Sequence, residues 1–163
     1  MRQCSVQTQF GFFNLVIDSQ APAFLADERQ VVGGVLKLTI SEVPEFQIAK
    51  SGEFADELIA WSSGELFALD AIPAIYPATV FRSQVSAAMR RVKAGQSSSY
   101  KALANSAGAP AAIRAAGSAC ARNPVPIIIP CHRIIKSDGS IGEFLYGTDL
   151  KRLLLQHEGI QIQ

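Results

Sequence analysis

The dipeptide Cys131-His132 is the first candidate for chemistry in this 163-residue sequence. A cysteine acts as a nucleophile in its thiolate form, and positive neighbours such as Arg133 lower the pKa of a thiol. His132 is a natural base for that thiol. Neighbours in an extended chain point to opposite faces, so the two side chains can interact only across a tight bend or through a water molecule. Because a single Cys-His pair is more often structural than catalytic, the surrounding residues must decide between the two interpretations.

Glu158 is a candidate partner for this pair. We predict a helix over about 148–159 that begins with Thr148 or Asp149 as its cap and ends at a glycine. Its apolar residues share one stripe: Leu150, Leu153, Leu154 and His157. Glu158 follows Leu154 by four residues, so we expect it to point inward with the stripe. A carboxylate on a buried face needs a partner.

A relay would satisfy all three groups. Val125–Ile129 is a short, wholly apolar segment between two prolines, for which we predict a buried strand that ends next to Cys131. A water-bridged relay from Cys131 to His132 and on to Glu158 would activate the thiol. Glu158 would orient the imidazole and stabilise its charge.

The elements that position these residues are mostly helical. We expect helices over Phe81–Val92, Tyr100–Ser106 and Pro110–Ala121, with N-cap candidates in Ser97–Ser99 and a break at Gly108. Helix, short turn and helix is the plan of a helix-turn-helix. Helical hairpins are also common in proteins that do not bind DNA, so the plan alone does not assign a function.

The helix over Pro110–Ala121 has an unusual surface. Its residues are nearly all small: Ala111, Ala112, Ala115, Ala116, Gly117, Ser118 and Ala119. Arg114 is the one charged side chain among them. Close packing against another helix accounts for part of this pattern, but it does not explain the lone arginine.

The first half of the chain carries strand signals. We predict strands over Phe10–Ile17 and over Val35–Ile40, the second after a turn at Gly33-Gly34. A helix is expected over Phe54–Trp61, and Ile72–Tyr76 is expected to be an extended linker. The fold class is therefore α/β (α+β). A small N-terminal β-sheet lobe with a helix (1–77) precedes a mainly helical C-terminal lobe (78–163) that contains the helix-turn-helix and the reactive cysteine.

The two halves differ in charge. Residues 1–78 hold four Lys or Arg against ten Asp or Glu, whereas residues 79–163 hold eleven against four. A basic half suggests that it faces a polyanion such as DNA. A charge match between the two lobes is an equally good interpretation.

Composition narrows the class of protein. No apolar run approaches the roughly 20 residues that span a bilayer, so we expect no membrane segment. Three cysteines, an odd and sparse count, favour a reducing compartment such as the cytoplasm. The two histidines do not complete a zinc set with them, so we expect no metal.

The segment around the candidate nucleophile carries a resemblance. Pro130-Cys131-His132-Arg133, reached through Asn123-Pro124-Val125-Pro126-Ile127-Ile128-Ile129, closely resembles the active-site signature of the O6-alkylguanine-DNA alkyltransferases (methylated-DNA–protein-cysteine methyltransferases). The similarity runs from about Phe81 to Gly159. It includes Gln84, Ser99-Tyr100, Leu103-Ala104, Arg114, Gly117, Ser137-Asp138-Gly139, Lys151, Leu154 and Glu158. The first half only loosely resembles the family's variable, ribonuclease H-like N-terminal lobe.

The resemblance implies a role for each matching residue. Cys131 would be the alkyl acceptor, and His132 with Glu158 would be the relay that activates it through water. Tyr100 would help to rotate the nucleotide and act as proton donor to the guanine. Arg114 would be the wedge that fills the gap left in the base stack.

The resemblance also implies two surfaces. The small-residue helix would enter the narrow minor groove with Ala112, Arg114, Ala115, Gly117, Ser118 and Arg122. Pocket and hinge would be formed by Asn123, Pro130, Ile134, Phe144, Leu145 and Tyr146. The family usually has a tyrosine and then small residues where this chain has Phe144-Leu145-Tyr146, which leaves the accepted alkyl group open.

The implied reaction is direct reversal of DNA damage. The protein would flip O6-alkylguanine out of double-stranded DNA and transfer the alkyl group irreversibly to Cys131, once per molecule, without a cofactor and as a monomer. Three alternatives stay open: a lesion-binding protein without transfer activity that flags damage, a Cys-His hydrolase of small substrates, and a transcriptional regulator that uses the helix-turn-helix.

Overall fold

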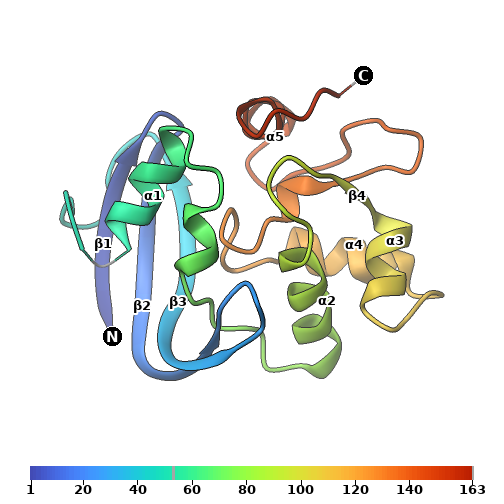
Figure 1. Ribbon diagram of the computed structural model, residues 1–163, viewed down its shortest axis with the longest axis horizontal. Helices are drawn as coiled ribbons and strands as arrows, with labels where there is room; N and C mark the ends of the chain where they lie inside the picture. Colours follow the sequence, from blue (N-terminus) through green and yellow to red (C-terminus); the bar gives the residue numbers. More distant parts are fainter. Residues whose placement is uncertain (53, 163) are drawn as a thin grey trace. The chain divides into compact units, whose positions relative to one another are not determined.

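The computed structural model describes residues 1–52 and 54–162, so Glu53 and Gln163 lie outside the described residues. The chain divides into two compact units, one from Met1 to Tyr76 and one that begins at Pro77 (Figure 1). No helix in the described ranges is long and apolar enough to cross a membrane.

The first unit is built on a three-stranded antiparallel sheet. Strands β1 (Arg2–Thr8), β2 (Gly11–Phe24) and β3 (Gln30–Ser41) follow one another in space in the order of the chain (Figure 1). Phe13, Leu15 and Ile17 alternate along β2 and are buried, as expected for one face of a sheet. The strands predicted over 10–17 and 35–40 are therefore confirmed, although both are longer than predicted and β1 was missed.

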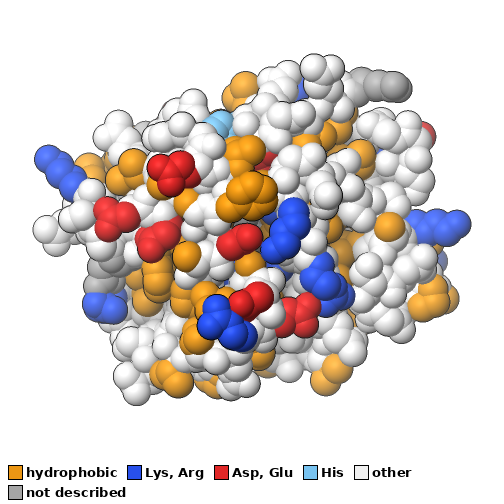
Figure 2. All heavy atoms as spheres, viewed as in Figure 1, with side chains coloured by type: hydrophobic (Ala, Val, Ile, Leu, Met, Phe, Trp, Pro, Cys, Tyr) orange, Lys and Arg blue, Asp and Glu red, His pale blue; other side chains and the backbone are white. Residues whose placement is uncertain are grey.

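Helix α1 (Ala55–Ser62) and the short 3₁₀ helix η1 (Ala68–Ala71) complete this unit. Trp61 of α1 is fully buried, with its ring centroid 5.4 Å from that of Phe10 and 6.1 Å from that of Phe13. The helix predicted over 54–61 is thus confirmed. Figure 2 shows acidic side chains gathered over α1 and the strands beside it, where Asp56 and Glu57 form the first turn of the helix.

Two predictions about the first unit are wrong. Gly33-Gly34 is not a turn but lies inside β3, because Gly34 is a close-approach site: a Cβ there would lie 2.6 Å from Ala23 Cβ and 2.7 Å from the Pro73 carbonyl oxygen. The segment 72–76 is extended as predicted but is not a free linker. Its Ala74 exchanges two backbone hydrogen bonds of 2.9 Å with Phe24.

The second unit is mainly helical. It contains α2 (Val80–Arg90), α3 (Tyr100–Ser106), α4 (Ile113–Ala121) and α5 (Thr148–His157), with the 3₁₀ helix η2 (Cys131–Arg133) between the last two (Figure 1). Two short parallel strands, β4 (Ser98–Ser99) and β5 (Ile134–Ile135), join the start of α3 to the segment after η2. The predicted helices are confirmed, and Ser99 caps α3 by accepting a 3.1 Å hydrogen bond from the Ala102 amide.

Two elements of this unit differ from the predictions. Helix α4 begins at Ile113 instead of Pro110, after a turn closed by the 2.9 Å bond from the Ala112 amide to the Ala109 carbonyl. Val125–Ile129 is buried as predicted but is a compact turn and not a strand. The Ile129 amide bonds back to the Val125 carbonyl at 2.9 Å, and Ile127 has a φ of 72°. Because prolines at 124, 126 and 130 donate no backbone hydrogen bond, this segment cannot form the regular backbone hydrogen bonds of a strand in a sheet.

Helix α5 differs in its cap and in its buried stripe. Its N-cap is Gly147, not Thr148 or Asp149. Leu153 is 53% exposed, whereas Lys151, Leu154 and Leu155 are buried. Glu158 is 2% exposed, so its predicted inward orientation is confirmed.

Candidate active site

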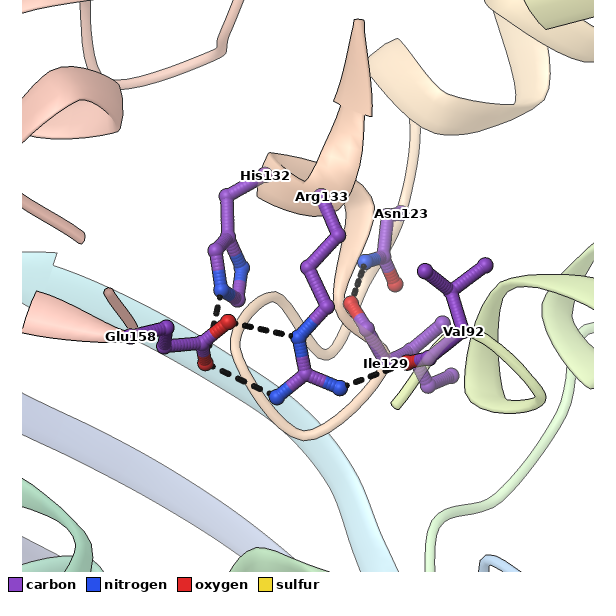
Figure 3. Close-up of polar contacts among 6 residues, drawn as sticks. All are labelled: Val92, Asn123, Ile129, His132, Arg133 and Glu158. Atoms are coloured by element: carbon purple, nitrogen blue, oxygen red, sulfur yellow. Dashed lines mark hydrogen bonds and ion pairs between the residues drawn. The ribbon is translucent and has the colours of Figure 1, made fainter. Parts of the chain in front are cut away.

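A buried carboxylate organises the polar centre of the second unit. The Arg133 guanidinium donates to both Glu158 oxygens, from Nε to Oε2 and from Nη2 to Oε1, each at 2.8 Å. His132 Nε2 lies 3.1 Å from Glu158 Oε1. Figure 3 shows His132 and Arg133 reaching Glu158 side by side, while Arg133 Nη1 donates to the Val92 carbonyl at 2.7 Å. The predicted contact between His132 and Glu158 is therefore present, and Arg133 is an additional partner that the sequence analysis did not identify.

The arrangement fixes the charge of each group. Burial alone would raise the pKa of Glu158, but hydrogen bonds from His132 and Arg133 outweigh it and lower that pKa to about 2. Burial lowers the pKa of His132 more than Glu158 raises it, so the ring is neutral at neutral pH. A neutral ring that donates Nε2–H to the carboxylate keeps a lone pair on Nδ1.

His132 Nδ1 is the free end of this chain of contacts. It is buried, and no described residue provides it with a hydrogen-bond partner. Buried polar atoms are normally paired, so an open acceptor at such a position suits a base or a water-binding site.

Cys131 opens the 3₁₀ helix η2 and is 6% exposed. Burial raises the pKa of its thiol, opposed by a hydrogen bond from Asn123 and by the charge of Lys151. The expectation that Arg133 would lower this pKa is wrong, because the Arg133 charge is engaged by Glu158 and burial dominates. The resting thiol therefore keeps its proton and needs a base.

Asn123 holds the turn that presents the thiol. Its Nδ2 donates to the Ile129 carbonyl at 2.7 Å (Figure 3), and its Oδ1 accepts from the Val125 amide at 3.1 Å. The residue thus closes the turn, apart from its contact with the Cys131 thiol. This matches the expected hinge position, although Asn123 does not line the pocket.

A cavity of about 140 Å³ opens beside the thiol. Its lining joins α3, α4, η2 and the loop before α5: Tyr100, Gly117, Cys120, Ala121, Cys131, Glu143, Phe144 and Leu145. Since one water occupies roughly 30 Å³ of liquid, the space admits a small organic group. Cys120 and Ala121 were not predicted here, although Cys120 follows Gly117 by three residues and so shares its helix face. Glu143 was not singled out, although it directly precedes Phe144 in the loop that was expected to form a wall of the pocket.

Tyr100 is half-buried at the edge of this cavity. Burial, helped by the nearby Cys120, Cys131 and Glu143, raises its pKa to about 12, so the phenol keeps its proton. Gly142 has a φ of 69°, and a Cβ there would lie 3.2 Å from the Tyr100 hydroxyl oxygen. A glycine is therefore required for the loop to pass so close to the ring.

Three residues expected at the pocket do not reach its wall. Pro130 is buried, and the buried Ile134 contributes its carbonyl as an acceptor for Lys151 Nζ at 2.6 Å. The Tyr146 ring packs against Phe144, with centroids 5.8 Å apart. The loop contributes Glu143, Phe144 and Leu145 to the wall, and Leu145 is 63% exposed.

The expected minor-groove surface lies on α4. Ala112, Ala115, Gly117 and Ser118 are exposed or half-buried, whereas Ala116 and Ala119 are buried. Arg114 is exposed and makes no hydrogen bond or ion pair with the described residues. Arg122 Nη2 instead donates to Ser118 Oγ at 2.6 Å. The helix therefore presents one unpaired cation on a surface whose other exposed side chains are small, apart from Ile113 at its first position.

Comparisons with known proteins match this unit and, in the case of a solved structure, nearly the whole chain. Residues 80–160 match the family 6-O-methylguanine DNA methyltransferase, DNA binding domain. The chain is 42% identical over 106 residues to a methylated-DNA–protein-cysteine methyltransferase of Methanosarcina barkeri, which covers 65% of this chain and 66% of that protein. It is 36% identical over 108 residues to that of Shigella flexneri, with 66% and 63% covered.

Two further relatives, one known by sequence and one by its solved structure, add to these matches. The bifunctional transcriptional activator and DNA repair enzyme Ada of Escherichia coli is 45% identical over 80 residues, which are 49% of this chain and 23% of Ada. This chain thus spans less than two thirds of the length of the Ada and Shigella flexneri relatives. A Mycobacterium tuberculosis OGT solved in complex with DNA has a TM-score of 0.76 at 27% identity, with 97% of this chain and 92% of that chain covered.

Proposed function

Because this chain belongs to the O6-alkylguanine-DNA alkyltransferase family, we propose that it repairs DNA by taking the alkyl group of an O6-alkylguanine onto Cys131. One observation carries the proposal. A protonated thiol opens onto a small cavity in the same unit as a neutral histidine whose Nδ1 has no partner among the described residues. A structural Cys-His pair would have no need of that open acceptor.

The proposed reaction is a displacement at the alkyl carbon. The Cys131 proton passes through a water molecule to His132 Nδ1, and ionised Glu158 stabilises the imidazolium that forms. The thiolate attacks the alkyl carbon, an S–C bond forms and the C–O bond to guanine breaks. Tyr100 donates its phenolic proton to the leaving base. The thioether has no route back to a thiol, so each molecule acts once.

Base flipping is part of the proposal because the alkylated oxygen sits inside the stacked duplex, beyond reach of a buried thiol. A helix with small side chains can approach the minor groove closely, and α4 carries such a surface. The unpaired Arg114 side chain would occupy the space that the flipped nucleotide leaves.

The test is an intact-mass measurement after incubation with a duplex that carries O6-methylguanine. We expect one methyl increment that maps to Cys131 and is absent in Cys131→Ala. The matched control is Cys120→Ala, which removes the other thiol of the cavity and should still be methylated. Tight binding with an unchanged mass would overturn the proposal and favour a lesion-binding protein that flags damage.

A further inference from the structure

Glu143 gives the cavity a charge that the proposed reaction does not use. Among the described residues that line the cavity, Glu143 is the one Asp, Glu, Lys or Arg. Burial raises the pKa of Cys120 to about 12, and it also raises the pKa of Cys131. With the Tyr100 phenol protonated as well, the Glu143 carboxylate sets the sign of the wall.

The cations near this cavity do not belong to its lining. Lys151 Nζ donates to the main-chain carbonyls of Ile134 at 2.6 Å and Glu143 at 3.1 Å, and it does not line the cavity. Arg133 is held by Glu158, and Arg114 is exposed on α4 away from the lining. An anionic group that entered the cavity would therefore meet the Glu143 carboxylate on the wall, and the charge of Lys151, which acts on Cys131 and Glu143, would offset only part of the repulsion.

We propose that Glu143 makes this pocket selective for uncharged alkyl groups. This inference rests on the proposed function and specifies its substrate class. O6-methyl and other neutral adducts would react, whereas adducts that carry a carboxylate, such as O6-carboxymethylguanine, would be rejected. The carboxylate of that adduct is attached directly to the carbon that Cys131 must attack, so it has to enter the same cavity of about 140 Å³ as the reacting carbon. Two like charges this close repel each other, and because Glu143 is exposed the repulsion is screened in part by solvent and salt.

The test compares transfer rates from three duplexes that differ only in the adduct: O6-methyl, O6-carboxymethyl and O6-carbamoylmethyl. The carbamoylmethyl group matches carboxymethyl in size but is neutral. We expect the wild-type protein to react roughly tenfold faster with carbamoylmethyl than with carboxymethyl at low salt, and this ratio should shrink as salt screens the exposed Glu143.

Glu143→Gln removes the charge and keeps the shape, so its ratio should fall toward one. Asp149→Asn is the matched control, because it removes one exposed carboxylate of the same unit that does not line the cavity and should keep the wild-type ratio. Comparison within each variant cancels any general gain in DNA affinity from the lost negative charge.

The possible outcomes distinguish a failure of the charge filter from a failure of the proposed function. Absence of methyl transfer would refute the proposed function, and the charge filter with it. Intact methyl transfer with a wild-type ratio near one would overturn the filter alone. An unchanged ratio of the two rates in Glu143→Gln would also overturn the filter. The same holds if all three transfer rates fall together in this variant, because Glu143 would then bind the guanine itself.

Discussion

Arg133 is a buried cation whose charge acts on Glu158 and not on the reacting thiol of Cys131. Its guanidinium makes a two-pronged contact with Glu158 and also satisfies the Val92 carbonyl. Such a fork keeps the carboxylate ionised and fixes its orientation. His132 then meets a rigid acceptor at Nε2, which leaves Nδ1 as the basic nitrogen. Arg133 is therefore a positioning residue that acts through Glu158.

Arg133→Met should damage both stability and transfer. Removing one partner of a buried ion pair leaves the other charge uncompensated, so the free energy of unfolding should fall by about 3–5 kcal/mol. Urea unfolding and single-turnover transfer at a temperature where the variant is folded measure the two effects. Arg152→Met, an exposed arginine on α5, is the control and should change stability by less than about 0.5 kcal/mol. Equal effects of the two substitutions would contradict the role of Arg133.

Acid should destabilise the protein in two steps. Burial lowers the pKa of His132 below its ordinary 6.5, so below that pH the unfolded chain takes up a proton that the folded chain does not. Burial opposes the ionisation of Glu158, but its partners lower its pKa from 4.5 to about 2, so a second loss falls between those values. The stabilising contribution of both groups is present above their ordinary pKa values and is lost as the pH falls.

Urea unfolding between about pH 8 and about pH 5 measures the first step. His132→Gln cannot titrate, so its free energy of unfolding should fall less over this range than that of the wild type. The same pH dependence in both proteins would show that His132 is not responsible.

At the scale of elements, local sequence signals predicted the helices better than the turns. Ser99 before α3 and the apolar spacing of α2 are local features, and the structure follows them. The turn over 125–129 was predicted as a strand because its residues are apolar and buried. Its true conformation depends on three prolines and on two hydrogen bonds with Asn123, which donates one and accepts the other.

The candidate site shows the same limit. The inward position of Glu158 follows from helical periodicity, which a sequence reveals. The lining by Glu143 depends on how a loop folds back over Tyr100, and the sequence gives no spacing rule for such a contact. The contact between Arg133 and Glu158 was also missed, because the sequence analysis assigned the charge of Arg133 to the neighbouring thiol of Cys131 and not to the carboxylate.

A further prediction concerns Arg114, the exposed arginine of α4. Arg114→Ala should slow transfer from O6-methylguanine in duplex DNA by roughly tenfold or more, because extruding a base costs a few kcal/mol that the wedge helps to offset. Transfer from the free base O6-methylguanine requires no flipping and should change little. Arg152→Ala is the control, because it removes an exposed cation of the same unit that lies on α5 and not on α4. Equal losses on duplex and free base would contradict the wedge.

At the scale of the whole molecule, the two halves of the chain carry net charges of opposite sign. The acidic excess lies in the first half of the sequence, and Figure 2 shows part of it over α1. The basic excess lies in the second half, together with the helix-turn-helix and the reactive thiol. If this excess meets DNA phosphates, binding must release counterions and must weaken as salt is added.

The salt dependence of binding to an undamaged duplex tests which unit meets DNA. The logarithm of the association constant should fall linearly with the logarithm of salt concentration, by about 0.9 for each phosphate contact. Lys101→Ala and Arg114→Ala each remove an exposed cation of the helix-turn-helix, and a residue that contacts a phosphate should lower the slope by about 1. Asp56→Asn with Glu57→Gln, at the start of α1, should leave the slope unchanged. A slope that responds to the α1 pair but to neither cation would place the DNA contact on the first unit instead.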